Sequence, residues 1–188
     1  PDRGIRLAWA AAGTWIAVNL PFALAAPGGW WEFFRYNAAR VADWDSLWYI
    51  ACERTTGQTC TNTQLINLAS LVMFVAWVAF VWVIKSRRDP GFPRWTLGFP
   101  ILVLFLLTNK VYSPQFSLWL LPWFAVAFPN LGWFVAFEIA DVAVFVTRFS
   151  WFGTYVGIDD GFAGLPLGVF EIAVGVRAVI LVLCVIGW

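Results

Sequence analysis

The sequence contains no histidine, and only 12% of its 188 residues are charged. Without histidine, the chain cannot build a bis-histidine haem site, most zinc and copper sites, or a histidine general base. Carboxylates, tyrosines and Lys110 are therefore the side chains that remain for proton transfer. The three cysteines fit no metal cluster. The net charge is +1, and no basic stripe with interleaved aromatic residues is present, so nucleic acid is not an expected partner.

Apolar residues make up 61% of the chain, and the mean hydropathy is +0.75. A soluble domain is about one quarter charged, because its solvated surface needs polar groups. A chain of 188 residues cannot hide this much apolar surface in one core, so the excess is expected to face lipid. The composition therefore predicts an all-α protein, a polytopic helical bundle in a cell membrane.

The chain begins at Pro1, and no short apolar segment with a small-residue cleavage site follows it. We expect residues 1–188 to be a single transmembrane domain of a longer polypeptide, whose N-terminal part would then be one of its partners. A mature N-terminus left by processing is the alternative.

Long apolar runs mark the candidate membrane spans. A helix that crosses about 30 Å of hydrocarbon needs about 20 apolar residues. Six segments are candidates: 5–26, 61–84, 96–112, 115–129, 131–149 and 166–187. The third and fourth are short and carry prolines, so they form either two spans or a broken hairpin that turns inside the protein.

Lysine and arginine indicate the orientation in the membrane, because they gather in cytoplasmic loops. The loop 85–95 carries four cations and one acid, which places it in the cytoplasm. The loop 27–60 is then extracytoplasmic, where an oxidising environment favours a disulfide between Cys52 and Cys60. Two free thiols are the alternative, and Cys184 is expected to be an inert residue of the last span.

Charged residues inside the spans need an explanation, because each costs about 2.5–3.5 kcal/mol on insertion scales. Glu138 and Asp141 lie three residues apart on one helical face of the fifth span, and Arg177 lies near the middle of the sixth. A buried ion pair between these two helices is the structural interpretation, and a proton or ion pathway is the functional one. Glu171 and Arg148 are expected to form a second pair.

A second polar cluster lies at the outer end of the third span. Pro114 removes a backbone donor and biases Ser113 away from helix. Hydroxyl and amide groups of Asn109, Tyr112 and Ser113 are thereby left beside the Lys110 ammonium. This combination suits an anionic lipid headgroup. Alternatively, Lys110 only extends to the interface and the turn only connects helices.

The segment from Asp43 to Asp45 is a third feature. An Asp-x-Asp pattern can hold a divalent cation or supply a base. It is a weak pattern, and Asp45 or Ser46 can instead cap a helix that begins at Leu47.

Two stretches of the sequence resemble a known family. The first is Asn109-Lys110-Val111-Tyr112-Ser113-Pro114-Gln115-Phe116, followed by Leu118-Trp119-Leu120-Leu121-Pro122. The second runs from Trp31 through Ala42-Asp43-Trp44-Asp45-Ser46-Leu47-Trp48-Tyr49. Both resemble the GT-C-fold glycosyltransferases, in particular the polyprenol-phosphate-mannose-dependent mannosyltransferases of actinobacteria, with a looser likeness to the GPI mannosyltransferases.

The resemblance implies a GT-C-like bundle that moves a sugar, mannose in that family, from a polyprenyl-phosphate donor to a glycan or lipid acceptor on the extracytoplasmic side. The residues that match the motif near the donor phosphate are Lys110, Tyr112, Ser113 and Gln115, with Asn109 beside them. Lys110 would stabilise the charge that develops on the leaving phosphate.

The catalytic carboxylate of that family lies in the first outer loop, and no convincing copy of this loop is visible. Asp43 and Asp45 are interpreted as part of a later loop, so they are weak candidates and the base stays unassigned. The chain alone is then expected to be inactive. A metal is not required, although a divalent cation at these two aspartates is left open.

A non-enzymatic function is the alternative. The broken hairpin would line a path through a proton-coupled transporter or a lipid-binding scaffold, and Glu138, Asp141 and Arg177 would move protons.

Overall fold

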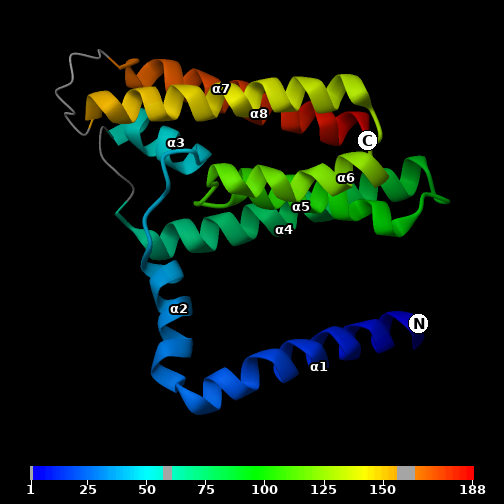
Figure 1. Ribbon diagram of the computed structural model, residues 1–188. Helices are drawn as coiled ribbons and strands as arrows, with labels where there is room; N and C mark the ends of the chain where they lie inside the picture. The colour runs from blue at the N-terminus through cyan, green and yellow to red at the C-terminus, as the bar shows by residue number, and fades with distance from the viewer. Residues whose placement is uncertain (1, 57–60, 156–163) are drawn as a thin grey trace. The chain divides into compact units, whose positions relative to one another are not determined.

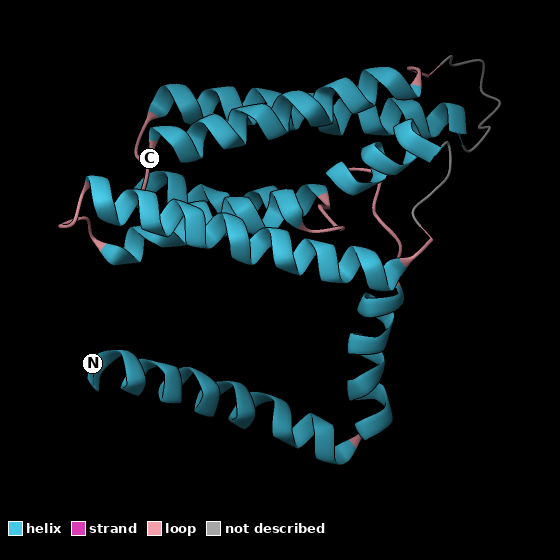
Figure 2. Cartoon of the chain, turned by 180° about the vertical axis from the view of Figure 1, so that it is seen from behind, coloured by secondary structure: helices cyan, strands magenta, loops and turns pink. Residues whose placement is uncertain are grey.

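The computed structural model describes residues 2–56, 61–155 and 164–188, and the described part of the chain is helical without a strand (Figures 1 and 2). Its elements are α1 (Asp2–Ala25), α2 (Pro27–Ala39), α3 (Leu47–Thr56), α4 (Thr63–Arg88), the 3₁₀ helix η1 (Arg94–Leu97), α5 (Gly98–Thr108), the 3₁₀ helix η2 (Pro114–Leu120), α6 (Leu121–Val126), α7 (Leu131–Tyr155) and α8 (Leu167–Gly187).

The chain divides into two compact units, Pro1–Arg40 and Val41–Trp188. In the first unit, α1 and α2 meet through aromatic side chains. The Trp15 and Trp30 ring centroids lie 6.4 Å apart, and the Trp30 indole N–H donates to Asn19 Oδ1 at 3.1 Å. The large apolar side chains of α1 are exposed in this unit, as expected of a helix whose solvent is lipid.

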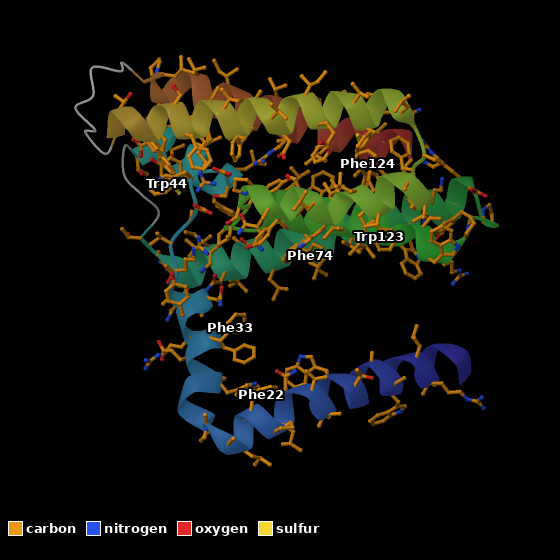
Figure 3. The ribbon with its side chains drawn as sticks, in the orientation of Figure 1. Phe22, Phe33, Trp44, Phe74, Trp123 and Phe124 are labelled. Atoms are coloured by element: carbon orange, nitrogen blue, oxygen red, sulfur yellow. The ribbon has the colours of Figure 1, made fainter. Side chains whose placement is uncertain are left out.

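The second unit packs α5 and α6 against the antiparallel pair α7 and α8. Phe124 of α6 lies between these layers, as Figure 3 shows, with its ring centroid 5.1 Å from that of Phe99 and 5.4 Å from that of Phe137. Phe99 and Phe137 are fully buried. This aromatic core fixes the two layers against each other, because stacked and edge-on aromatic pairs add to the gain from burial.

Among the residues that the structure describes, three helices are long and apolar enough to cross a membrane: Gly4–Ala25, Thr63–Arg88 and Leu167–Gly187. Helix α7 has 25 residues, but Glu138, Asp141 and Arg148 interrupt its apolar character. The six-span arrangement stays a prediction.

The segments predicted as the third and fourth spans form a hairpin of short helices. Helix α5 has 11 residues, and η2 and α6 follow it as 7 and 6 residues. Pro114 begins η2 and Pro122 lies at the start of α6, where a proline is tolerated because the first helical N–H groups lack intrahelical partners. Of the two arrangements the sequence left open, the short helices resemble the broken hairpin.

The segment 27–60, predicted as a loop, contains the helices α2 and α3, and α3 begins at Leu47 as expected. The segment 85–95 is partly helical, because α4 continues to Arg88 and η1 begins at Arg94.

Contacts place the helix ends of the second unit. The Lys85 ammonium donates to the Trp188 carbonyl at 2.9 Å, so the C-terminal ends of α4 and α8 lie together. At the other end, Arg54 of α3 pairs with Glu171 of α8.

Gly98 provides a test of the packing between α5 and α6. A Cβ atom at this position would overlap the ring of Trp123. We expect Gly98→Ala to destabilise the protein by about 1–3 kcal/mol, as overpacking of a filled interior does. The thermal unfolding midpoint in detergent measures this loss.

Gly175 of α8 is the matched control, since nothing lies within 4 Å of a Cβ atom there. Gly175→Ala should keep or raise the midpoint, because alanine favours helix. Adding Trp123→Leu to Gly98→Ala should make the combined loss smaller than the sum of the two single losses. Equal midpoints for Gly98→Ala and wild type would contradict the tight contact.

Candidate functional site

Two stretches far apart in the sequence meet at one end of the second unit. The Asp43 N–H donates to the Lys110 carbonyl at 2.8 Å, and the Ser113 hydroxyl donates to Asp43 Oδ2 at 3.2 Å. The Trp48 indole N–H donates to the Thr108 carbonyl at 2.9 Å. The loop 41–46 and the start of α3 are therefore hydrogen-bonded to the segment that connects α5 with η2.

Ser46 gives the loop its local shape. Its hydroxyl accepts from the Tyr49 N–H at 3.1 Å, so Ser46 is the N-cap of α3. The same hydroxyl donates to the Asp43 carbonyl at 2.6 Å, and the Ser46 N–H donates to that carbonyl at 2.9 Å. The alternative cap, Asp45, does not act as one, because its carboxylate turns to an arginine instead.

Arg148 of α7 lies between the two aspartates of the loop. Its guanidinium is 2.8 Å from Asp45 Oδ2 and 4.0 Å from Asp43 Oδ1. It also lies over the rings of Trp44 and Phe152, at 5.9 and 5.2 Å from their centroids. Such cation–π contacts add to the ion pairs in holding the guanidinium in place.

The predicted pair between Arg148 and Glu171 is wrong. Glu171 pairs with Arg54 of α3, and Arg148 pairs with the aspartates. Their positions along the two predicted spans place Arg148 and Glu171 at similar depths in the membrane. Position along a span does not show toward which neighbour each side chain points.

Arg177 of α8 is 1% exposed and connects three elements. Its guanidinium is 2.9 Å from Asp141 Oδ1 on α7, donates to the Asp45 carbonyl at 3.3 Å and lies 3.8 Å from the centroid of the Tyr112 ring. Glu138, which the sequence grouped with this pair, makes no ion pair with the described residues.

Asp141 also accepts from the Ser117 hydroxyl at 2.6 Å, again through Oδ1. The Tyr112 hydroxyl lies 3.4 Å from that serine oxygen. A continuous polar network thus runs from the loop 41–46 through Arg177 to η2. Buried polar groups of this kind are stable only when they are partnered.

Two atoms of the network have no hydrogen-bond partner among the described residues: Asp45 Oδ1 and Arg148 Nε. Both are buried. Each retains hydrogen-bonding capacity next to the Asp45–Arg148 ion pair.

A groove of about 610 Å³ opens beside this network. Its walls come from η2 and α7: Ser113, Pro114, Gln115, Leu118, Asp141, Val142, Phe145, Arg148 and Phe149. The lining therefore combines a hydroxyl, an amide, a carboxylate and a guanidinium with apolar and aromatic side chains, and each wall contributes both kinds.

The predicted donor-binding residues divide into two groups. Ser113 and Gln115 line the groove, whereas Asn109, Lys110 and Tyr112 do not. Lys110 is 5% exposed, and the loop 41–46 is hydrogen-bonded to its backbone. The expectation that Lys110 is open to a headgroup is therefore wrong, because a second loop packs onto the turn that carries it.

Arg148 is the cation that lines the groove, and the sequence analysis assigned it no site. A signal was present: Asp141 and Arg148 are seven residues apart, two turns on one face of a helix, in a span that already carried acids.

The aspartate pair does not fit a divalent cation. A guanidinium already compensates the charge of both carboxylates, and no group of three or more acidic or cysteine ligands occurs among the described residues. Elsewhere, Cys52 is disulfide-bonded, its predicted partner Cys60 lies outside the described residues, and Cys184 is a buried free thiol.

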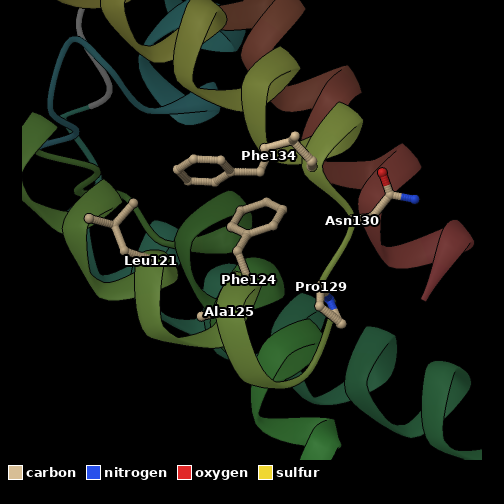
Figure 4. A pocket seen from close by; sticks show the side chains of 7 residues that line it. Leu121, Phe124, Ala125, Pro129, Asn130 and Phe134 are labelled. Carbon is tan, nitrogen blue, oxygen red and sulfur yellow. The ribbon is translucent and has the colours of Figure 1, made fainter.

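A second pocket, of about 350 Å³, lies where the turn after α6 meets α7 (Figure 4). Figure 4 shows the rings of Phe124 and Phe134 next to each other in its lining, with their centroids 5.6 Å apart, and Asn130 is its single polar side chain. It carries no ionisable group, so the groove beside Arg148 is the better candidate for chemistry.

Burial raises the pKa of Asp45 from 3.8 to about 6, and the nearby cations of Arg148 and Arg177 oppose this rise. The folded protein therefore binds a proton at this carboxyl over a pH range in which the unfolded chain has released it.

No protein-family model, no curated protein and no solved structure matches the chain.

The pKa of Asp45 predicts a pH-dependent stability. Between about pH 4 and 6 the folded state holds more protons than the unfolded state, so the free energy of unfolding falls as the pH rises. The contribution is at most about 3 kcal/mol. Asp45→Asn removes it, so the variant should match wild type near pH 4 and become relatively more stable towards pH 7.

Thermal midpoints of both proteins from pH 4 to pH 7.5 check this. The difference between the variant and wild type removes the contribution that the other carboxylates make to the pH dependence of stability. If the variant instead loses stability with rising pH, the pairing of Asp45 with Arg148 outweighs its desolvation.

Proposed function

We propose that this protein is part of a membrane glycosyltransferase that moves a hexose, mannose by resemblance, from a polyprenyl phosphate to a glycan or lipid acceptor on the extracytoplasmic side. The single observation that carries the proposal is the hydrogen bond from Ser113 to Asp43. It joins the two stretches that resemble the GT-C family, which are 70 residues apart in sequence. Two motif-like segments that meet beside a groove are a better basis for function than either segment alone.

The groove fits an amphipathic donor. Phe145 and Phe149 are each 52% exposed, and Leu118 is 62% exposed, so an isoprenoid chain has an apolar surface to lie along. Arg148 lines the same groove, and its guanidinium can bind a phosphate. In this arrangement Arg148 takes the role that the sequence gave to Lys110.

The reaction is a substitution at the anomeric carbon of the sugar. The acceptor hydroxyl oxygen forms a bond to this carbon, and the bond from the carbon to the phosphate oxygen breaks. The acceptor proton passes to Ser113 Oγ while the Ser113 proton passes to Asp43 Oδ2, along the hydrogen bond of 3.2 Å. Polyprenyl phosphate leaves with its electron pair, and Arg148 stabilises its charge.

Asp43 is a better base than its neighbours on geometric grounds. The Asp45 side chain is fully buried and paired, so it does not reach the groove. Asp141 lines the groove, but its Oδ1 already accepts from both Arg177 and Ser117. Asp43 is one hydrogen bond from the groove wall at Ser113.

Asp43→Asn should lower the rate of sugar transfer by about 10²–10⁴-fold, because the base is lost. Binding of the donor should change little, since Asp43 does not line the groove. Transfer from a polyprenyl-phosphate-mannose donor to acceptor, in proteoliposomes, measures the rate, and donor binding is measured separately by equilibrium titration.

Glu138→Gln is the matched control, because Glu138 is a carboxylate of α7 that does not line the groove. It should transfer sugar at the wild-type rate. Wild-type transfer by Asp43→Asn would refute the assignment of the base. If Glu138→Gln abolishes a proton-coupled flux in the same vesicles and no transfer is seen, the protein is a transporter.

The relay through Ser113 has its own test. Ser113→Ala should slow transfer at least tenfold, because no hydroxyl then connects the groove with Asp43. Ser113→Thr keeps a hydroxyl and should restore most of the rate. Equal rates for the alanine and threonine variants would mean that the hydroxyl does not carry the proton.

A further inference from the structure

A third concavity lies at the other end of α8. It has a volume of about 430 Å³ and is formed by the C-terminal ends of α4 and α8. Along α8, Trp188 is about 16 Å from Arg177, at 1.5 Å of rise per residue. The polar network of the candidate site does not extend to this end, and we name this third concavity the α4–α8 groove.

The α4–α8 groove has apolar walls and a cationic rim. Phe80, Val81 and Ile84 form one wall, and Val185 and Ile186 form the other. Phe80 is 55% and Ile186 is 74% exposed. Lys85 follows Ile84 directly along α4 and Arg88 lies one turn further on, and both stand at the rim together with Asp89.

The charge at this end is unbalanced. The segment 85–94 carries four cations, Lys85, Arg87, Arg88 and Arg94, against one acid, Asp89. Asp89 is 3.9 Å from Lys85, and within the described part of the chain the three arginines make no ion pair. A net charge of about +3 is therefore left over at the end of an apolar helix, where the Debye length of about 8 Å lets the cations act together.

Lys85 is already oriented at the rim. Its ammonium donates to the Trp188 carbonyl at 2.9 Å and lies 4.6 Å from the centroid of the Trp188 ring. An ammonium has three donors, so further donors are left for a ligand oxygen. Arg88 is exposed and contributes a planar guanidinium that can bind a phosphate through two N–H groups.

We propose that the α4–α8 groove binds an anionic phospholipid, with an acyl chain between the ends of α4 and α8 and the headgroup phosphate against Arg88 and Lys85. Charge complementarity selects this occupant. A neutral lipid would use the walls and leave the cations unpaired, and a small soluble anion would leave the apolar walls uncovered. Basic pockets between the ends of membrane helices are known to suit acidic headgroups.

Native mass spectrometry of the full protein in detergent, titrated with phosphatidylglycerol or phosphatidylcholine, tests the proposal. We expect phosphatidylglycerol to bind with the higher affinity and Arg88→Gln to weaken it about fivefold, the effect of one cation near an anionic lipid. Binding of phosphatidylcholine should not change.

Arg87→Gln is the matched control, because Arg87 is the adjacent residue and does not line the groove. Arg87 carries the same charge as Arg88 and is also exposed. It should leave phosphatidylglycerol binding within about twofold of wild type. Both residues are on the surface, so both variants should unfold at the wild-type temperature.

Three results would overturn the proposal. Equal weakening by Arg87→Gln and Arg88→Gln would mean a diffuse attraction to surface charge and no site. Equal affinity for the two lipids would mean ordinary contact with bilayer lipid. An Arg88→Gln variant that binds phosphatidylglycerol as wild type does would mean that the lipid lies elsewhere.

Discussion

The ion pairs that Arg148 makes with the loop 41–46, and the hydrogen bond that Arg177 donates to it, are the constraint on which the candidate site depends. Arg148 holds the Asp45 carboxylate and Arg177 holds the Asp45 carbonyl, so one short loop is attached to both α7 and α8. Burying these charges costs free energy, and the attraction between them offsets it only while every partner stays in place. The position of Asp43, and through it that of Ser113, follows from this attachment.

The second unit is therefore polarised along its helices. One end contains the carboxylates and arginines, with the groove beside them. The middle is an aromatic core in which Phe99, Phe124 and Phe137 pack without polar groups. The far end carries the excess of cations around Arg88. Such a distribution suits a body whose middle lies in hydrocarbon and whose ends meet headgroups, because charge is tolerated only near the interface or in paired form.

Some of this arrangement could be predicted from the sequence, and the reasons for the rest are physical. The long apolar runs predict α1, α4 and α8, because a run of about 20 apolar residues is long enough to cross the hydrocarbon layer as one helix. Ser46 before Leu47 predicts the start of α3, because capping is local. The partners of Arg148 and the burial of Lys110 depend on which loops pack together. No local pattern encodes that, and so Glu171 was paired wrongly and Lys110 was expected to be exposed.

The buried charges themselves favour chemistry over stability as their explanation. An aromatic core already joins the layers of the second unit, so the bundle does not need ion pairs to hold α7 against α8. Replacing buried ion pairs with apolar residues is often neutral or stabilising. The network also leaves Asp45 Oδ1 and Arg148 Nε unpartnered among the described residues, which a purely structural arrangement would avoid. Groups that are costly to bury, incompletely partnered and adjacent to a groove fit the proposed reaction at an anionic lipid.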